Sequence, residues 1–146
     1  NFGWNHEEMK TPLEKLAELV EAKDDYELFY GLALNALNKH AQDPNFMRLL
    51  LYAALEGHDL AQRFFENFVV EVYNFLGAYI KERQNEGIFI DMEPRIMIRA
   101  FIGMIMHHSL NNTLWDKQQT LLKVSNEEAA RQFTEILLNG VLTKQS

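Results

Sequence analysis

The residues best suited to chemistry in this chain are five histidines and a scattered set of carboxylates. His107 and His108 are adjacent, so on a helix their side chains diverge by about 100° and are poorly placed to share one metal ion. Neither histidine has a carboxylate four residues later, and the H-E-x-x-H pattern of zinc enzymes is absent. We therefore predict no metal site, and expect a core or interface histidine with one hydrogen bond.

Catalytic motifs are also missing. The chain has no cysteine, which excludes thiolate nucleophiles, zinc–thiolate sites and disulfides. It has no G-x-S-x-G sequence and no glycine-rich phosphate loop, and no motif pairs Glu56, Glu66 or Glu71 with a nucleophile or base. The sequence predicts neither an enzyme nor a bound cofactor, and a helical enzyme or metal carrier is the weakest of the alternatives.

Aromatic residues recur at helical spacing at Phe65, Phe68, Phe75 and Tyr79. Such a stripe most often belongs to a hydrophobic core, and it can also line an apolar pocket. The hydroxyls of Tyr73 and Tyr79 are candidates for the few placed polar groups of such a pocket. The residues alone leave both interpretations open.

The stretch 91–115 is strongly apolar and organises the chain. Asp91 suits a helix N-cap and Pro94 the first turn. Around this helix, apolar residues occupy nearly every side, and those of the third side are Ile98, Ile102 and Met106. A helix that is apolar nearly all round must be covered on more than one face. We expect its own fold to cover one face and a partner chain to cover another.

Caps and helical spacing predict an all-α bundle of about six helices. The expected helices span 12–22, 26–40, 44 to just before Gly57, 59–85, 94–115 and 125–142. Their end signals are capping boxes at Thr11 and Ser125, the pair Asp43-Pro44, and Gly87 as a left-handed cap. No segment shows the alternating pattern of a strand.

Length and charge limit the function classes. The 146 residues form one domain by size, with 47% hydrophobic residues and a net charge of −7. An acidic chain without a basic stripe is repelled by nucleic acid phosphates. The apolar run 96–106 is interrupted by Arg99 and falls short of the roughly 20 residues that span a bilayer. We expect a cytoplasmic chain that was trimmed from a longer protein, because it lacks an initiator methionine and a signal peptide.

Several end signals together resemble a known family. They are the helix end Ile80-x-x-x-Gln84-x-x-Gly87, the helix start Asp91-Met-Glu-Pro94, and a final L-x-x-G at 137–140. Over about residues 24–143 the chain resembles the C-terminal effector-binding and dimerisation domain of TetR-type transcriptional regulators, a family that includes repressors. Residues 1–23 would then be a connecting segment with a short helix, and 24–146 the ligand-binding and dimerisation domain.

The resemblance implies a small, mostly apolar effector enclosed by the central helices. The residues expected to line its pocket are Phe65, Phe68, Tyr73, Phe75, Tyr79, Phe101, Met104 and His108. His108 is the candidate to orient the effector. The family's DNA-binding part is an N-terminal helix-turn-helix, and nothing in this sequence corresponds to it, so DNA contact would require a segment outside these residues.

The resemblance also implies a homodimer in which the last two helices pair with their copies as a four-helix interface. The residues expected there are Ile98, Ile102, Met106, Ala129, Phe133, Ile136, Leu137 and Gly140. The main alternative is a structural helical module that binds another protein through the same helices and has no small-molecule ligand.

Overall fold

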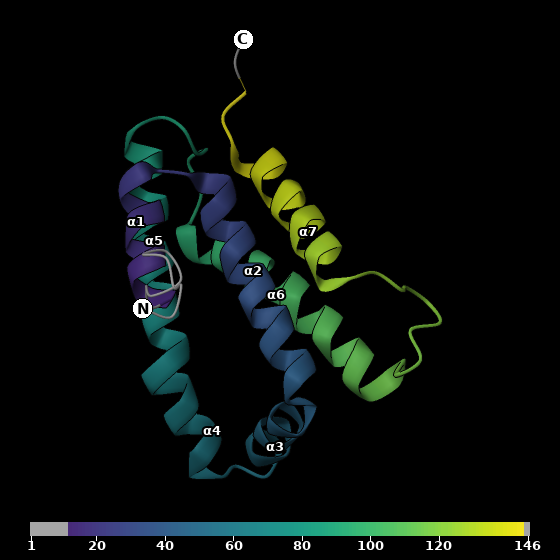
Figure 1. The fold of residues 1–146 in the computed structure, drawn as a ribbon. Coiled ribbons are helices and arrows are strands. Elements are labelled where there is room, and N and C mark those ends of the chain that lie inside the picture. The colour runs from purple at the N-terminus through teal and green to yellow at the C-terminus, as the bar shows by residue number, and fades with distance from the viewer. Residues whose placement is uncertain (1–11, 145–146) are drawn as a thin grey trace, which may run out of the picture.

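The computed structural model describes residues 12–144, which form helices and loops with one isolated β-bridge (Figure 1). The elements are α1 (Pro12–Ala22), α2 (Asp25–Gln42), α3 (Pro44–Leu55), α4 (Asp59–Phe64), η1 (Phe65–Val69), α5 (Val70–Asn85), α6 (Pro94–Leu110), η2 (Asn111–Trp115) and α7 (Asn126–Val141). The two η segments are π-helical and continue α4 into α5 and extend α6, so the described residues hold six continuous helices. The predicted all-α bundle is confirmed, while the predictions for residues 1–11 fall outside the described residues.

Most helix ends follow the predicted local signals. The Asp43 side chain accepts a hydrogen bond from the backbone N–H of Phe46 (3.1 Å), with Pro44 in the first turn of α3. Ser125 accepts in the same way from the N–H of Glu128 (3.1 Å) at the start of α7. Gly87 has φ +79° after α5, in the region that glycine adopts without steric cost.

The predicted cap of α6 is wrong by two residues. The N-cap is Glu93, whose carboxylate accepts from the N–H and the side chain of Arg95, and Asp91 lies in the preceding turn. Pro94 explains the difference, because a proline at the first helical position makes the residue directly before it the cap.

The core surrounds α2, which runs through the middle of the molecule between α1 and α5 on one side and α6 and α7 on the other (Figure 1). One face of α2 is fully buried at Leu28, Phe29, Ala33 and Leu37. The ring of Phe29 packs edge-on against Phe101 of α6, with 5.2 Å between the ring centroids. Burying one such side chain stabilises the fold by about 1.5–3 kcal/mol.

The connector between α5 and α6 is tied to the chain that follows α7. Gln84 donates its amide hydrogens to the carbonyls of Ile90 (3.0 Å) and Met92 (2.6 Å). The N–H of Ile90 donates to the carbonyl of Val141 (2.7 Å), and the N–H of Thr143 donates to the carbonyl of Ile88 (2.9 Å). Gln84, the glutamine of the Q-x-x-G helix end, therefore holds the connector that leads into α6. The two backbone hydrogen bonds tie the same connector to the end of α7.

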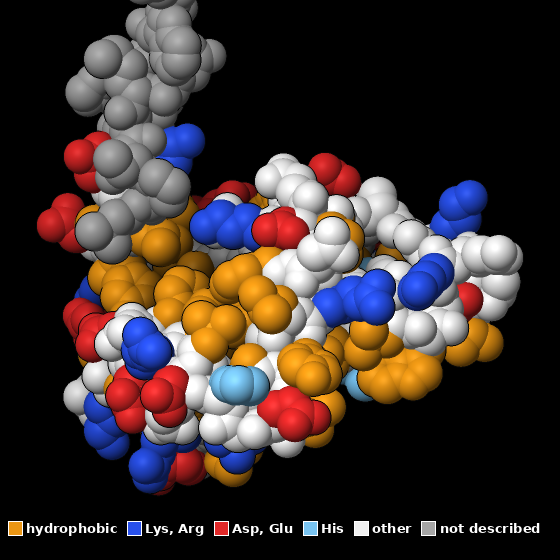
Figure 2. All heavy atoms as spheres, turned by 90° about the horizontal axis from the view of Figure 1, so that it is seen from below, with side chains coloured by type: hydrophobic (Ala, Val, Ile, Leu, Met, Phe, Trp, Pro, Cys, Tyr) orange, Lys and Arg blue, Asp and Glu red, His pale blue; other side chains and the backbone are white. Residues whose placement is uncertain are grey.

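The end of the molecule formed by α3, α4 and η1, named here the aromatic end, is packed differently. Its buried residues are Met47 and Ala53 of α3, and α4 and η1 have none. Figure 2, a view from below Figure 1, shows hydrophobic side chains gathered on the surface. The exposed large hydrophobic residues of the aromatic end are Phe46, Leu49, Tyr52, Leu55, Leu60, Phe65 and Phe68.

Candidate functional site

The eight residues predicted to bind a ligand fall into three groups. Tyr79, Phe101 and His108 are buried, and Tyr73, Phe75 and Met104 are partly buried against the core. Phe65 and Phe68 lie on η1 with 51% and 55% of their surfaces exposed. The structure therefore does not gather the eight in one place, and only the η1 pair belongs to the aromatic end.

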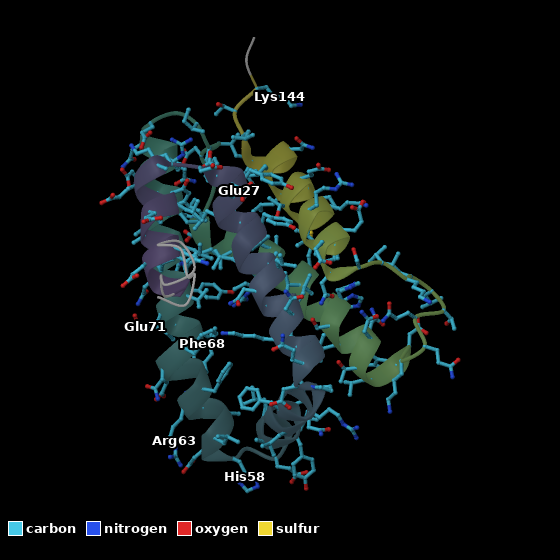
Figure 3. All side chains as sticks on the ribbon, in the orientation of Figure 1. Glu27, His58, Arg63, Phe68, Glu71 and Lys144 are labelled. Carbon is cyan, nitrogen blue, oxygen red and sulfur yellow. The ribbon has the colours of Figure 1, made fainter. Side chains whose placement is uncertain are left out.

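Phe68 belongs to an aromatic cluster that the sequence analysis did not predict. Phe64 stacks on Phe68 with ring centroids 5.2 Å apart, and Phe46 of α3 meets Phe64 edge-on at 6.1 Å. In Figure 3, Phe68 lies on the flank of the long helix nearest α2, while Arg63 and Glu71 lie on the other flank. This cluster joins α3 to the long helix. The four-residue spacing of Phe64 and Phe68 is a local sign of their contact, whereas the contact with Phe46 has none.

A hollow of about 580 Å³ lies between α3 and α4, named here the α3–α4 hollow. Its lining residues are Leu49, Tyr52, Ala53, Gly57, His58, Asp59, Leu60 and Arg63. The side from α3 is apolar, while His58, Asp59 and Arg63 add polar groups. None of the eight predicted ligand residues lines this hollow. A small apolar molecule bound here would contact α3 and α4 instead.

Tyr79, expected to offer its hydroxyl to a ligand, instead holds two helices together. Its hydroxyl donates to Asp25 Oδ1 (2.5 Å), and Arg83 donates to both oxygens of Asp25 (3.0 and 2.8 Å). Burial and the bond to Asp25 raise the pKa of Tyr79 well above its usual range. Asp25 and Arg83 are far apart in sequence and carry no shared motif, which is why the sequence analysis missed this clamp.

His108 connects the two predicted sets of residues. It is 7% exposed, its ring lies edge-on to Phe133 at 5.5 Å, and its Nε2 is 3.3 Å from the amide nitrogen of Asn112. Burial, and to a smaller extent the neighbouring His107, lower the pKa of His108 below its usual value. A neutral His108 that contacts α7 acts as an interhelical contact, which matches the expected core or interface histidine.

The residues predicted for the dimer interface also divide. Ile98, Ala129 and Leu137 are buried in the chain's own core, and Ile102 and Phe133 pack partly against it. The first three side chains are covered without a partner, whereas Ile102 and Phe133 keep part of their surface exposed. Ile136, at 61% exposed, and Gly140 remain at the surface, and Met106 is half-buried.

Each of the last two helices carries a second stripe, mostly of apolar or small residues, on its outward side. On α6 the exposed residues Ile96, Ala100, Gly103 and His107 repeat at steps of four, three and four residues. On α7, Phe133, Ile136 and Gly140 follow one another at steps of three and four residues, with Phe133 partly buried and the other two exposed. We call these faces the outward stripes. Spacing of this kind forms the seam between packed helices.

A second hollow, of about 420 Å³, has a different character and is named here the polar hollow. It lies where the end of α2, the start of α3, η2, the loop 116–125 and the start of α7 come together. Its lining residues are His40, Ala41, Pro44, Asn45, Arg48, Asn112, Thr113, Lys117, Gln119, Val124 and Asn126. Two cations and four amides therefore face a space that no lining carboxylate shares.

Comparisons with protein families, with curated proteins and with solved structures returned no match to this chain. Among residues 12–144, no helix is both long enough and apolar enough to cross a bilayer. The same residues hold no group of three or more metal-ligating side chains.

Proposed function

We propose that this chain is the ligand-sensing and dimerisation domain of a TetR-like transcriptional regulator that acts as a homodimer. The observation that carries the proposal is the pair of outward stripes on α6 and α7. In this proposal DNA binding belongs to a segment outside the 146 residues, because this acidic chain has no basic stripe of its own.

The outward stripes favour contact with a second copy of the chain over exposure to solvent. Gly103 and Gly140 leave open space where a side chain would begin, with no atom within 4 Å of a Cβ built there. Small residues let helix backbones approach closely, and α6 and α7 run antiparallel side by side (Figure 1). Two copies would form a four-helix interface in which the same surface is used twice, as a two-fold axis requires.

The predicted interface changes in composition under this proposal. Ile136, Gly140 and Phe133 stay in it, and Ile96 and Ala100 join it from α6. Ile98, Ala129 and Leu137 support it from behind, because they fill the core beneath the two helices.

The aromatic end supports the sensing half of the proposal. Its exposed aromatic residues and the α3–α4 hollow offer a place for a small, mostly apolar effector. An effector that binds one arrangement of α3 and α4 more tightly than another increases the population of the arrangement that it prefers. The π-helical turn η1 lies where the aromatic end joins the packed part of the long helix, and such turns often mark functional positions.

Ile136→Asp tests the proposal, because Ile136 is exposed and the variant keeps the core of the chain intact. We expect the wild-type chain to sediment as a dimer and the variant to dissociate at least about a hundredfold more readily, since an unpaired buried charge costs about 3 kcal/mol or more.

Leu122→Asp is the matched control, because Leu122 is 53% exposed and lies in the loop before α7. It should sediment as the wild type does. A wild-type chain that is monomeric at high concentration would overturn the proposal. It would favour the alternative of a helical module that binds a different protein.

A further inference from the structure

We infer that the polar hollow binds a small polyhydroxylated anion, such as a sugar phosphate or a sugar acid. This inference goes beyond the proposed function and does not depend on it, because none of the lining residues belongs to the outward stripes or to the aromatic cluster.

The cations of the polar hollow are the first argument. Arg48 of α3 and Lys117 of the following loop both line it, and among the described residues neither forms an ion pair. In a chain with a net charge of −7, two unpaired cations at one hollow attract an anion locally. A guanidinium group also matches the geometry of a carboxylate or phosphate.

The carboxylates next to this hollow do not compete for those cations. Asp43 caps α3 by accepting from the N–H of Phe46. Asp116 accepts from the N–H and the hydroxyl of Thr120 and from the N–H of Leu121, so both of its oxygens are bonded. Asp43 and Asp116 therefore form no ion pair with Arg48 or Lys117, the two cations that line the hollow.

The amide side chains of the polar hollow are the second argument, and they favour a ligand that carries hydroxyl groups. Asn112 uses its NH2 group toward His108 (3.3 Å), and Asn126 uses its NH2 group toward Asn38 (2.9 Å). Their carbonyl oxygens remain to accept hydrogen bonds, while Thr113 can both donate and accept. Carbonyl oxygens that accept hydrogen bonds therefore lie beside two cations. This combination suits a ligand in which hydroxyl groups are attached to an anionic group.

The fold holds this arrangement in place from several elements. His40 is fixed through its Nδ1, which lies 2.8 Å from the hydroxyl of Ser109 on α6. Asn112 and Thr113 belong to the π-helical turn η2, a departure from α-helical geometry of the kind found at binding sites. Segments separated by more than seventy residues thus converge on one polar space.

Calorimetric titration of the full chain tests the inference with three probes, namely ribose 5-phosphate, gluconate and uncharged ribose. We expect one or both anions to bind and ribose not to bind. Arg48→Ala and Lys117→Ala should each weaken binding about tenfold, the loss of one charge-assisted hydrogen bond. Whichever anion binds more tightly identifies the anionic group that is preferred.

Lys81→Ala is the matched control for Lys117→Ala, because Lys81 is also an exposed lysine but lies on α5 and lines neither hollow. Its affinity should stay within about twofold of the wild type, since distant surface charges are screened by salt. Absence of binding by both anions, binding of ribose as tightly as the anions, or equal losses in the Lys117 and Lys81 variants would each overturn the inference. Because the Ile136→Asp chain should bind the anion normally, this test is independent of dimerisation.

Discussion

The region around α2 and the aromatic end both contain several aromatic residues, yet they use them in opposite ways. Phe29 and Phe101 are almost fully buried and contact each other within the core. Phe46 and Phe68 also touch an aromatic neighbour, but about half of each side chain faces solvent. The comparison teaches that the chain's own core covers the aromatic rings of one region, whereas the other leaves aromatic surface uncovered, as expected of a place that receives a ligand.

The largest expected effect comes from truncating a phenylalanine in each region. Phe101→Ala should lower the free energy of unfolding by about 3–5 kcal/mol, because it leaves a cavity in the core. Phe68→Ala should lower it by less than about 1 kcal/mol, because its side chain is already half in water. Urea denaturation of both variants measures the difference, and equal losses would contradict the division into two regions.

The clamp between α2 and α5 should give the next largest effect. Asp25→Ala leaves the Tyr79 hydroxyl and the Arg83 guanidinium, whose side chain is 11% exposed, without their shared acceptor. We expect a loss of about 2–3 kcal/mol in the free energy of unfolding. Glu135→Ala breaks the exposed pair with Arg131 and serves as the control, with no measurable change expected. A stable Asp25 variant would show that the packed region does not depend on this clamp.

Hydrogen exchange should separate the two regions without any mutation. Amides of the buried face of α2 should exchange at least about a hundredfold more slowly than those of α4 and η1, which have no buried residues. Mass spectrometry of peptides from each region measures these rates. Equal protection in α2 and α4 would mean that the aromatic end is as stably packed as the core.

The smallest expected effect is a dependence of stability on pH that originates in the packed region. Burial lowers the pKa of His40 and of His108 below the usual 6.5, so the unfolded chain binds protons more readily than the folded chain. Stability should be full above that value and decrease as the pH falls below it. Unfolding at a series of pH values measures this, and His40→Gln should reduce the slope. Stability that rises with acidity in this range would contradict burial of the two rings.

Local signals explain how much of the fold was predictable. Asp43-Pro44, Gly87 and Ser125 mark helix ends through contacts with residues a few positions away, so the sequence carries that information. The long helix 59–85 was predicted as one element, but its π-helical turn was not. That turn widens the helix by one residue, and no local pattern in the sequence marks it.

The candidate sites were less predictable, because they depend on which face of a helix turns inward. Periodicity shows that α6 is apolar all round, but only packing decides that Ile98 faces the core and Ile96 the solvent. The polar hollow could not be predicted for a similar reason. Arg48 and Lys117 come from different segments, and the sequence gives no sign that they meet.

Native mass spectrometry of the purified wild-type chain tests the central claim most directly. The proposal predicts a species at twice 17.1 kDa, with additional small-molecule mass that is lost on denaturation if an effector is carried through purification. A chain that appears only at 17.1 kDa at every concentration would contradict pairing through the outward stripes, and with it the proposed regulator domain.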